Sequence, residues 1–149
     1  MAVEIIRLGA GTRYPTAALR KIAETLLRAL KQGRAELSIA LVGDREMRPL
    51  NAKYRKKNKT TDVLSFFVQD QPKSGAKLLG DVVISVEQAR RQARERARTL
   101  KSEMVTLLIH GILHLLGYDH EKSPRQAKIM FACERKLYAH LCDCGLLKV

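Results

Sequence analysis

The sequence has few cysteines, few aromatic residues, few acidic residues and no long apolar stretch, and each shortage excludes a class of protein. Its three cysteines, Cys133, Cys142 and Cys144, are an odd number clustered late in the chain, which excludes a disulfide framework. Cys142 and Cys144 also lack the second ligand pair that a structural zinc site needs. The most apolar segment, residues 106–117, contains two histidines and is too short to span a bilayer.

The N-terminal residues 1–7 do not read as a targeting signal, because Glu4 and Arg7 interrupt the apolar stretch that a signal peptide needs. With neither a signal nor a membrane span in the sequence, we expect a cytoplasmic protein that does not enter a membrane. Residues 9–11 (Gly-Ala-Gly) lack the rest of a glycine-rich phosphate-binding pattern, so we interpret them as a turn.

Acidic residues are outnumbered, since 15 Asp and Glu stand against 28 Lys and Arg, for a formal net charge of +13. Such an excess favours a polyanionic partner, with nucleic acid first and an anionic membrane surface second; solubility alone is the remaining explanation. Aromatic residues make up 5% of the chain, so we expect base stacking to contribute little to an RNA affinity and sequence readout to be limited.

The residues that are present suffice for one folded domain, residues 1–149. A chain of this length with 46% apolar residues can bury its own core without disulfides. We predict an α+β fold, in which a small mixed sheet of about four strands is covered by about five helices. Alternation and helical spacing predict strands at 3–8, 37–42, 62–68 and 79–85, and helices at 15–31, 86–98, 101–116 and 124–141, with one short helix after residue 43.

The short helix has two candidate starts. Asp44 is a suitable N-cap, and Met47, Leu50 and Tyr54 would share one side of a helix that follows it. Pro49 removes a helical donor and clashes one turn back, which favours a start nearer to Pro49.

The last helix has a clear beginning, because Ser123 can cap it and Gln126 completes a capping box. Further along, Glu134 lies on the apolar face of this helix. We expect this carboxylate to pair with a nearby cation or a buried donor, with a role behind a metal ligand as the alternative.

Three of the four histidines fall between residues 110 and 120. His110 and His114 are one helical turn apart, so their rings share a face. Gly117 can end the helix in a left-handed conformation and turn the chain back, which would bring His120 to the same point. Three imidazoles leave a fourth metal position open, as catalytic zinc sites do. We therefore predict a metal site on a buried helix and the turn after it, with satisfied core or surface histidines as the alternative.

The same helix is apolar on nearly every side except for one polar stripe, formed by Glu103, Thr106, His110 and His114. A buried imidazole costs free energy unless it has a partner, and a shared metal or a cleft along the stripe would supply one. His140 falls outside this pattern and is expected at the surface.

The histidine offsets match the metzincin zinc motif H-E-x-x-H-x-x-G-x-x-H. Gly111 stands where those proteases carry their general base, and a glycine cannot take a proton from metal-bound water. Peptide hydrolysis is therefore disfavoured unless a carboxylate from elsewhere substitutes. The candidates for a base, or for a residue supporting a metal ligand, are Asp81, Glu103, Asp119 and Glu121.

A dense basic run precedes the third predicted strand and consists of Lys53, Arg55, Lys56, Lys57 and Lys59. Contact with RNA phosphates and a solvated loop are equally compatible with such a run. Arg55 is the strongest candidate, because a guanidinium binds a phosphate bidentately and stays charged.

A family resemblance rests on four stretches: 51–55 (NAKYR), 61–66 (TDVLSF), 79–85 (LGDVVIS) and 110–121 (HGILHLLGYDHE). In this order they resemble the YbeY-type rRNA maturation endoribonucleases, and the last stretch is the most specific. One departure is Phe67, where the family usually has proline, so the following loop is expected to differ.

The resemblance implies a cytoplasmic hydrolase with one Zn²⁺ per chain held by His110, His114 and His120, other divalent transition metals being alternatives. It also implies a cleft lined by Arg55 and cleavage of single-stranded RNA. The implied processes are maturation of small-subunit rRNA and ribosome quality control, with RNA or the small ribosomal subunit as partner. In this interpretation Arg55 and His114 are catalytic, through phosphate binding and metal binding.

Two other functions remain open from the sequence. One is a metal hydrolase acting on peptide or ester bonds, and the other is a non-enzymatic RNA- or ribosome-binding factor with a structural metal. The attacking oxygen, water or the RNA 2′-hydroxyl, is also left open.

Overall fold

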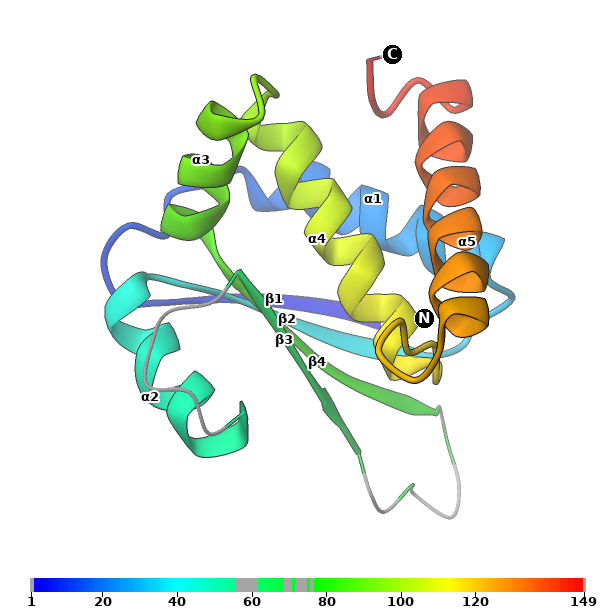
Figure 1. Ribbon diagram of the computed structural model, residues 1–149, viewed down its shortest axis with the longest axis horizontal. Helices are drawn as coiled ribbons and strands as arrows, with labels where there is room; N and C mark the ends of the chain where they lie inside the picture. The colour runs from blue at the N-terminus through cyan, green and yellow to red at the C-terminus, as the bar shows by residue number, and fades with distance from the viewer. Residues whose placement is uncertain (1, 56–61, 69–70, 72–74, 76, 149) are drawn as a thin grey trace.

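The computed structural model describes residues 2–55, 62–68, 71, 75 and 77–148. These residues form the predicted α+β fold, with a four-stranded mixed sheet and five helices (Figure 1). None of these described helices is both long and apolar enough to cross a membrane. The elements in chain order are β1 (Ala2–Leu8), α1 (Thr16–Ala29), β2 (Glu36–Val42), α2 (Asp44–Arg55), β3 (Val63–Phe67), β4 (Leu78–Ser85), α3 (Val86–Glu95), α4 (Leu100–Leu115) and α5 (Pro124–Asp143).

The sheet has the strand order β1-β2-β4-β3. β1 runs parallel to β2, and β2 runs parallel to β4, whereas β3 is antiparallel to β4 at the sheet edge. In the register, Ile39 lies opposite Val82, and Leu64 opposite Val83. The edge position of β3 matters for function, because α4 crosses this strand and β4.

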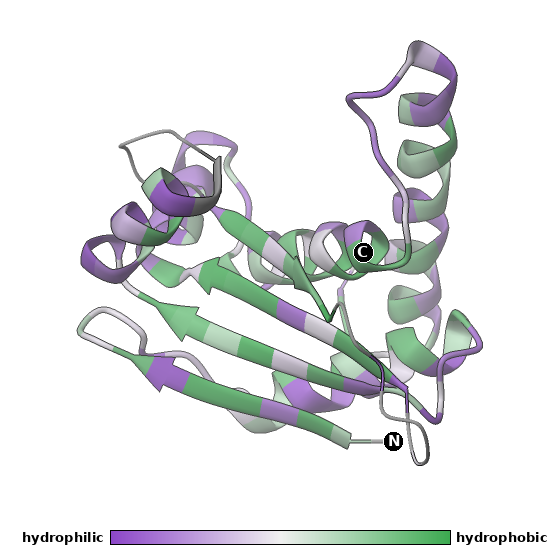
Figure 2. Cartoon of the chain, turned by 90° about the horizontal axis from the view of Figure 1, so that it is seen from below, coloured by the Kyte–Doolittle hydropathy of each residue, from purple (hydrophilic) through white to green (hydrophobic). Residues whose placement is uncertain are grey.

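The two faces of the sheet are covered unequally. On one face α1, α3, α4 and α5 pack together over the strands (Figure 1), and the fully buried Ile39, Val82 and Leu108 belong to this main core. On the other face α2 covers only one end, through a small cluster that includes Met47. Figure 2 shows apolar and polar residues alternating along the strands, the pattern of a sheet that is buried on one side and partly open on the other.

The structure corrects two predicted helix ends. α2 begins at Asp44 and continues through Pro49, so the start near Pro49 was wrong. The turn before Pro49 is held because Met47 is completely buried and its N–H donates to the Gly43 carbonyl. Helix α3 ends at Glu95 instead of continuing to residue 98, because Ala97 adopts a left-handed conformation with a φ of 53°.

Candidate metal centre

Helix α4 places the His110 and His114 rings side by side near its C-terminal end. Their centroids are 4.7 Å apart, and their Nε2 atoms lie 3.2 Å from each other. Without a shared cation, one of these two nitrogens must carry a proton and donate it to the other. The one-turn spacing thus gives the common face that the sequence predicts.

A tight turn then returns the chain to the same point. Gly117 has a φ of 97°, which is available to glycine at little cost. Its N–H donates to the His114 carbonyl, and the Tyr118 N–H donates to the Leu113 carbonyl, each at 3.0 Å. This pair of bonds is a Schellman motif, which satisfies the last helical carbonyls.

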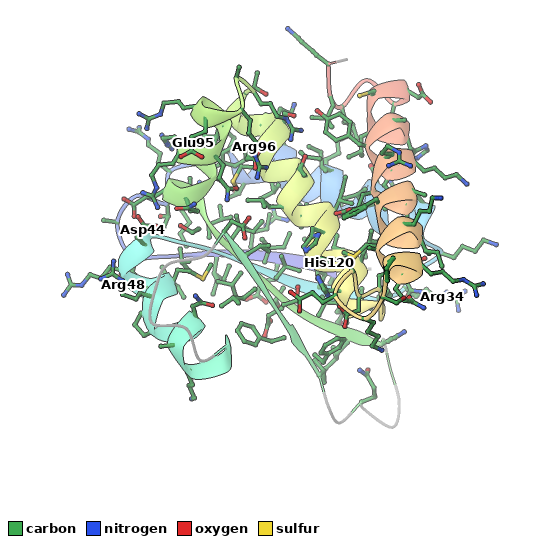
Figure 3. All side chains as sticks on the ribbon, viewed as in Figure 1. Arg34, Asp44, Arg48, Glu95, Arg96 and His120 are labelled. Atoms are coloured by element: carbon green, nitrogen blue, oxygen red, sulfur yellow. The ribbon has the colours of Figure 1, made fainter. Side chains whose placement is uncertain are left out.

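The turn brings the third imidazole to the first two, as predicted. The His120 ring centroid lies 5.1 Å from that of His110 and 5.5 Å from that of His114. One ring nitrogen from each of the three falls within 4.8 Å of the others. Figure 3 labels His120 in the segment that joins α4 to α5. Three nitrogens at this separation form a donor set that a single divalent transition metal accepts.

Helix α5 supports the centre from behind. The Glu134 Oε2 atom lies 2.9 Å from His110 Nδ1. A carboxylate only accepts hydrogen bonds, so Nδ1 carries the ring proton and Nε2 presents its lone pair toward the other histidines. A carboxylate that orients a ligand histidine in this way is the common arrangement behind protein-bound zinc.

The turn is also tied to α5. Tyr118 in the turn and Cys133 on α5, the residue before Glu134, both pack against the main core. Interaction with the Cys133 side chain raises the pKa of Tyr118 above its ordinary value. The segment that carries His120 therefore lies beside the helix that orients His110.

The electrostatics of the centre favour a neutral imidazole at His114. Burial lowers the pKa of His114 below its ordinary value, and the neighbouring His110 and His120 lower it further. A neutral ring keeps a lone pair available for a metal. The buried Nδ1 of His120 has no hydrogen-bond partner among the described residues, an orphaned polar atom that a cation or a bound water would satisfy. The donor set, the lowered pKa of His114 and this orphaned nitrogen all fit a metal ion.

Gly111 points away from the centre and into the sheet. A Cβ built at this position would lie 2.6 Å from Val82 Cγ1, and the Gly111 carbonyl accepts a hydrogen bond from the Ser65 hydroxyl at 3.0 Å. Position 111 therefore has no room for the glutamate of a metzincin. The missing side chain allows α4 to approach β3 and β4 closely.

The three histidines open onto a cleft of about 1190 Å³ that extends over the less covered face of the sheet. Within the described residues its lining contains no Lys or Arg. Instead it contains the candidate carboxylates Asp81, Asp119 and Glu121, together with Glu4 and Asp62. The Asp119 side chain accepts the N–H of Glu121 at 2.9 Å, and a Glu121 oxygen lies 3.9 Å from His120 Nε2.

The fourth candidate carboxylate, Glu103, lies elsewhere. Its side chain is completely buried near the N-terminal end of α4, where it pairs with Arg96 at 2.9 Å and Arg98 at 3.4 Å. It lies seven positions before His110, which is about 10 Å along a helix. Glu103 therefore holds α3 against α4 and does not reach the histidines.

The basic run is only partly visible. Lys53 is exposed on α2. Lys56, Lys57 and Lys59 lie outside the described residues, as does the side chain of Arg55, which is the last residue of α2. The expected cleft lining by Arg55 therefore stays a prediction. His140 is exposed, as expected.

Sequence reasoning missed two residues near the centre. Ser65, within the stretch 61–66, anchors the Gly111 carbonyl, and its only signal was a polar residue at a core-facing strand position. Phe131 on α5 lies with its ring 6.4 Å from that of His120, although 46% of the residue is exposed. An exposed aromatic on an amphipathic helix was the signal that could have found it.

Comparison with known proteins gives one consistent family. The family profile described as Endoribonuclease YbeY matches residues 10–142. An endoribonuclease YbeY of Myxococcus xanthus is 55% identical over 117 residues, which cover 77% of this chain and 40% of that protein. A relative of the same name from Persephonella marina is 41% identical over 124 residues, which cover 83% of this chain and 81% of the relative.

A solved structure agrees with the fold. The solution structure of a Thermotoga maritima protein superposes with a TM-score of 0.66 and 28% sequence identity. The match covers 95% of this chain and 89% of that one. The similarity therefore extends over nearly the whole of both chains, including the helices that form the histidine centre.

Proposed function

The chain belongs to the endoribonuclease YbeY family, and from this premise we propose that it is a zinc-dependent endoribonuclease for single-stranded RNA. The substrate class we propose is rRNA of the small ribosomal subunit, cleaved in the cytoplasm during ribosome maturation. Residues 1–149 would act as one hydrolase domain. The observation that carries this proposal is the convergence of three imidazoles, within 4.8 Å, at the side of an open cleft.

The proposed metal ligands are His110, His114 and His120. When bound, a zinc ion there would polarise a phosphate oxygen or lower the pKa of a water molecule. Glu134 keeps the His110 Nε2 lone pair aimed at the centre, and the hydrogen-bonded turn at Gly117 and Tyr118 holds His120 in place. Zinc is favoured because an imidazole set backed by a carboxylate is typical of zinc, although such a set also suits other transition metals.

Substrate handling is assigned to α2 and the residues after it. We propose that Arg55 binds the scissile phosphate bidentately and offsets the charge that develops in the transition state. Lys53, Lys56, Lys57 and Lys59 would then add phosphate contacts that depend on salt and not on sequence.

The general base is proposed to be one of three carboxylates, Asp81, Asp119 or Glu121, because they line the same cleft as the imidazoles. Replacing each carboxylate by its amide tests this assignment. Only the variant that lacks the general base should lose the rise of cleavage rate with pH that deprotonation of the base produces. The product ends identify the nucleophile, because attack by the 2′-hydroxyl leaves a 2′,3′-cyclic phosphate.

The proposal is tested by cleavage of a labelled single-stranded RNA and of the same strand in a duplex. We expect His114→Ala to lose both bound zinc and activity. Arg55→Ala should keep its zinc and lose about 10²–10³ in kcat, the usual effect of deleting a charge-stabilising group. Arg48→Ala is the matched control, because Arg48 is exposed on the same helix (Figure 3). Equal cleavage by wild type and all three variants would show that a contaminating nuclease is responsible.

A further inference from the structure

A second, smaller groove lies on the far side of the His110–Glu134 pair from the cleft. It runs between α4 and α5, has a volume of about 320 Å³ and presents mostly apolar surface. Glu134 belongs to its wall while hydrogen-bonding His110, which lines the cleft. The groove and the histidine centre therefore share one wall.

Phe131 stands where the groove meets the centre. It lines the groove, its ring lies 6.4 Å from the His120 ring, and 46% of the residue is exposed. The exposed part of the Phe131 ring is an apolar aromatic surface on which a planar group can stack. Any ligand stacked on Phe131 would lie next to the atoms bound at the histidines.

The charged residues of the groove are Arg98, Arg135 and Glu134, and Arg98 also pairs with the buried Glu103. Ser102 at 2.6 Å and Thr106 at 2.9 Å hold Arg98 in the wall, with its guanidinium 5.9 Å from the Tyr138 ring centre. Arg135 lies on the exposed side of α5 and also lines the groove. Aromatic rings beside arginines are the usual platform for single-stranded nucleic acid, in which bases stack and guanidinium groups bind the phosphates.

We propose that this groove is a nucleotide subsite, in which the base next to the scissile phosphate stacks on Phe131 and its outer phosphate contacts Arg135. The inference rests on the proposed function and extends it by giving the RNA an exit away from the acidic described lining of the cleft. The groove volume lies at the lower end of small-molecule sites, which suits one nucleobase. Such a subsite would fix where the RNA strand lies relative to the centre. It would not distinguish one base from another, because every base has a π-face that can stack.

The test is a double-mutant cycle between the protein and the RNA. A single-stranded RNA with one mapped cleavage site is prepared intact and with an abasic ribose at each position near that site. For the wild type we expect one adjacent abasic position to lower kcat/KM by roughly fivefold or more, the worth of one stacked base. Phe131→Ala should lower cleavage of the intact RNA by the same factor and be insensitive to that abasic position. Phe131→Trp should restore the sensitivity.

Matched controls come from the same helix. Ile129→Ala removes an apolar residue that is 44% exposed but does not line the groove, so it should leave cleavage unchanged. Arg135→Ala should weaken RNA binding and reduce the slope of log affinity against log salt by about 1. Lys136→Ala should change the affinity and the slope by less.

The outcomes separate the two proposals. If Phe131→Ala cleaves intact RNA like the wild type, or keeps the abasic effect, the subsite is wrong while the nuclease assignment stands. If the zinc-loaded wild type does not cleave, the nuclease assignment fails. The same cycle measured by equilibrium binding of the oligonucleotides then decides the subsite alone.

Discussion

The two ends of α4 use the same backbone device for opposite purposes. Before its N-terminal end, α3 closes in a Schellman pattern at Ala97, with the Arg98 N–H bonded to the Ala93 carbonyl at 2.8 Å. After its C-terminal end, a second Schellman motif at Gly117 brings His120 back. Each turn places a side chain against a polar residue of α4.

The difference between the two ends lies in what the polar groups find. At the first end the buried Glu103 carboxylate meets two guanidinium groups from within the protein. At the second end three imidazoles meet each other beside a cleft, and the buried His120 Nδ1 has no partner among the described residues. Buried polar groups that are satisfied internally hold the fold together. A buried polar group that stays unsatisfied beside a cleft is instead available to a bound ligand.

The largest effect is expected from breaking the internally satisfied end. Arg96→Met with Arg98→Met leaves the buried Glu103 carboxylate without cations and should lower the free energy of unfolding by about 3–5 kcal/mol. Adding Glu103→Leu should recover much of this loss, because apolar residues can replace a buried ion pair. Urea denaturation measures both. Zinc content of the folded protein should not change; its loss would show that the two ends are not independent.

A smaller effect is expected behind the histidines. Glu134→Gln keeps a hydrogen-bond acceptor for His110 but removes its charge, and Glu134→Ala removes both. Zinc affinity should fall by about 10–100-fold for the alanine variant and by less for glutamine. Competition with a chromophoric chelator measures this without RNA. Glu95→Gln, an exposed carboxylate on α3 (Figure 3), serves as the control, and an equal fall there would point to general electrostatics.

The two turn residues offer a reciprocal exchange. Ala97→Gly relieves a left-handed alanine and should raise the free energy of unfolding by about 1 kcal/mol. Gly117→Ala imposes that strain where φ is 97°, and it should lower stability by a similar amount, although nothing lies within 4 Å of the added Cβ. Only the second exchange should also weaken zinc binding. Thermal melts and chelator competition on the same preparations check both expectations.

The smallest effect is a dependence of metal-free stability on pH. The folded-state pKa of His114 lies below its ordinary value of 6.5, so the unfolded chain binds its proton first. The contribution of His114 is therefore fully present above pH 6.5 and is lost as the pH falls through the folded pKa. Urea midpoints between pH 8 and 5, in the presence of chelator, should fall more for the wild type than for His114→Gln. His140→Gln should behave like the wild type.

Local signals predicted most of the chain. Alternating apolar residues predicted the strands at 37–42 and 79–85, and Ser123 predicted the capped start of α5. The spacing of the histidines around Gly117 predicted their convergence. The end of α3 escaped prediction because an alanine, not a glycine, takes the left-handed position. The helical course through Pro49 escaped it because the burial of Met47 outweighs the lost hydrogen bond.

Long-range pairings were beyond the sequence. The strand order β1-β2-β4-β3 depends on which surfaces fit together, and no local pattern encodes it. The sequence offered a role behind a metal ligand for Glu134 only as an alternative, because His110 is 24 positions away and only the packing of α5 on α4 makes them partners. From the sequence, Gly111 could be interpreted only as the loss of a metzincin's general base. The structure gives the reason for the glycine, because a Cβ at this position would collide with Val82 of the sheet.

The three imidazoles all come from one continuous segment, residues 110–120. Bringing them together therefore costs little conformational entropy, because the loop that closes is only a few residues long. We expect the centre to assemble as soon as α4 and its turn form, before the strands far away in sequence have paired. A cation captured at that moment would act as a staple on the nascent helix end, so metal supply during synthesis would influence the yield of folded protein as well as its activity.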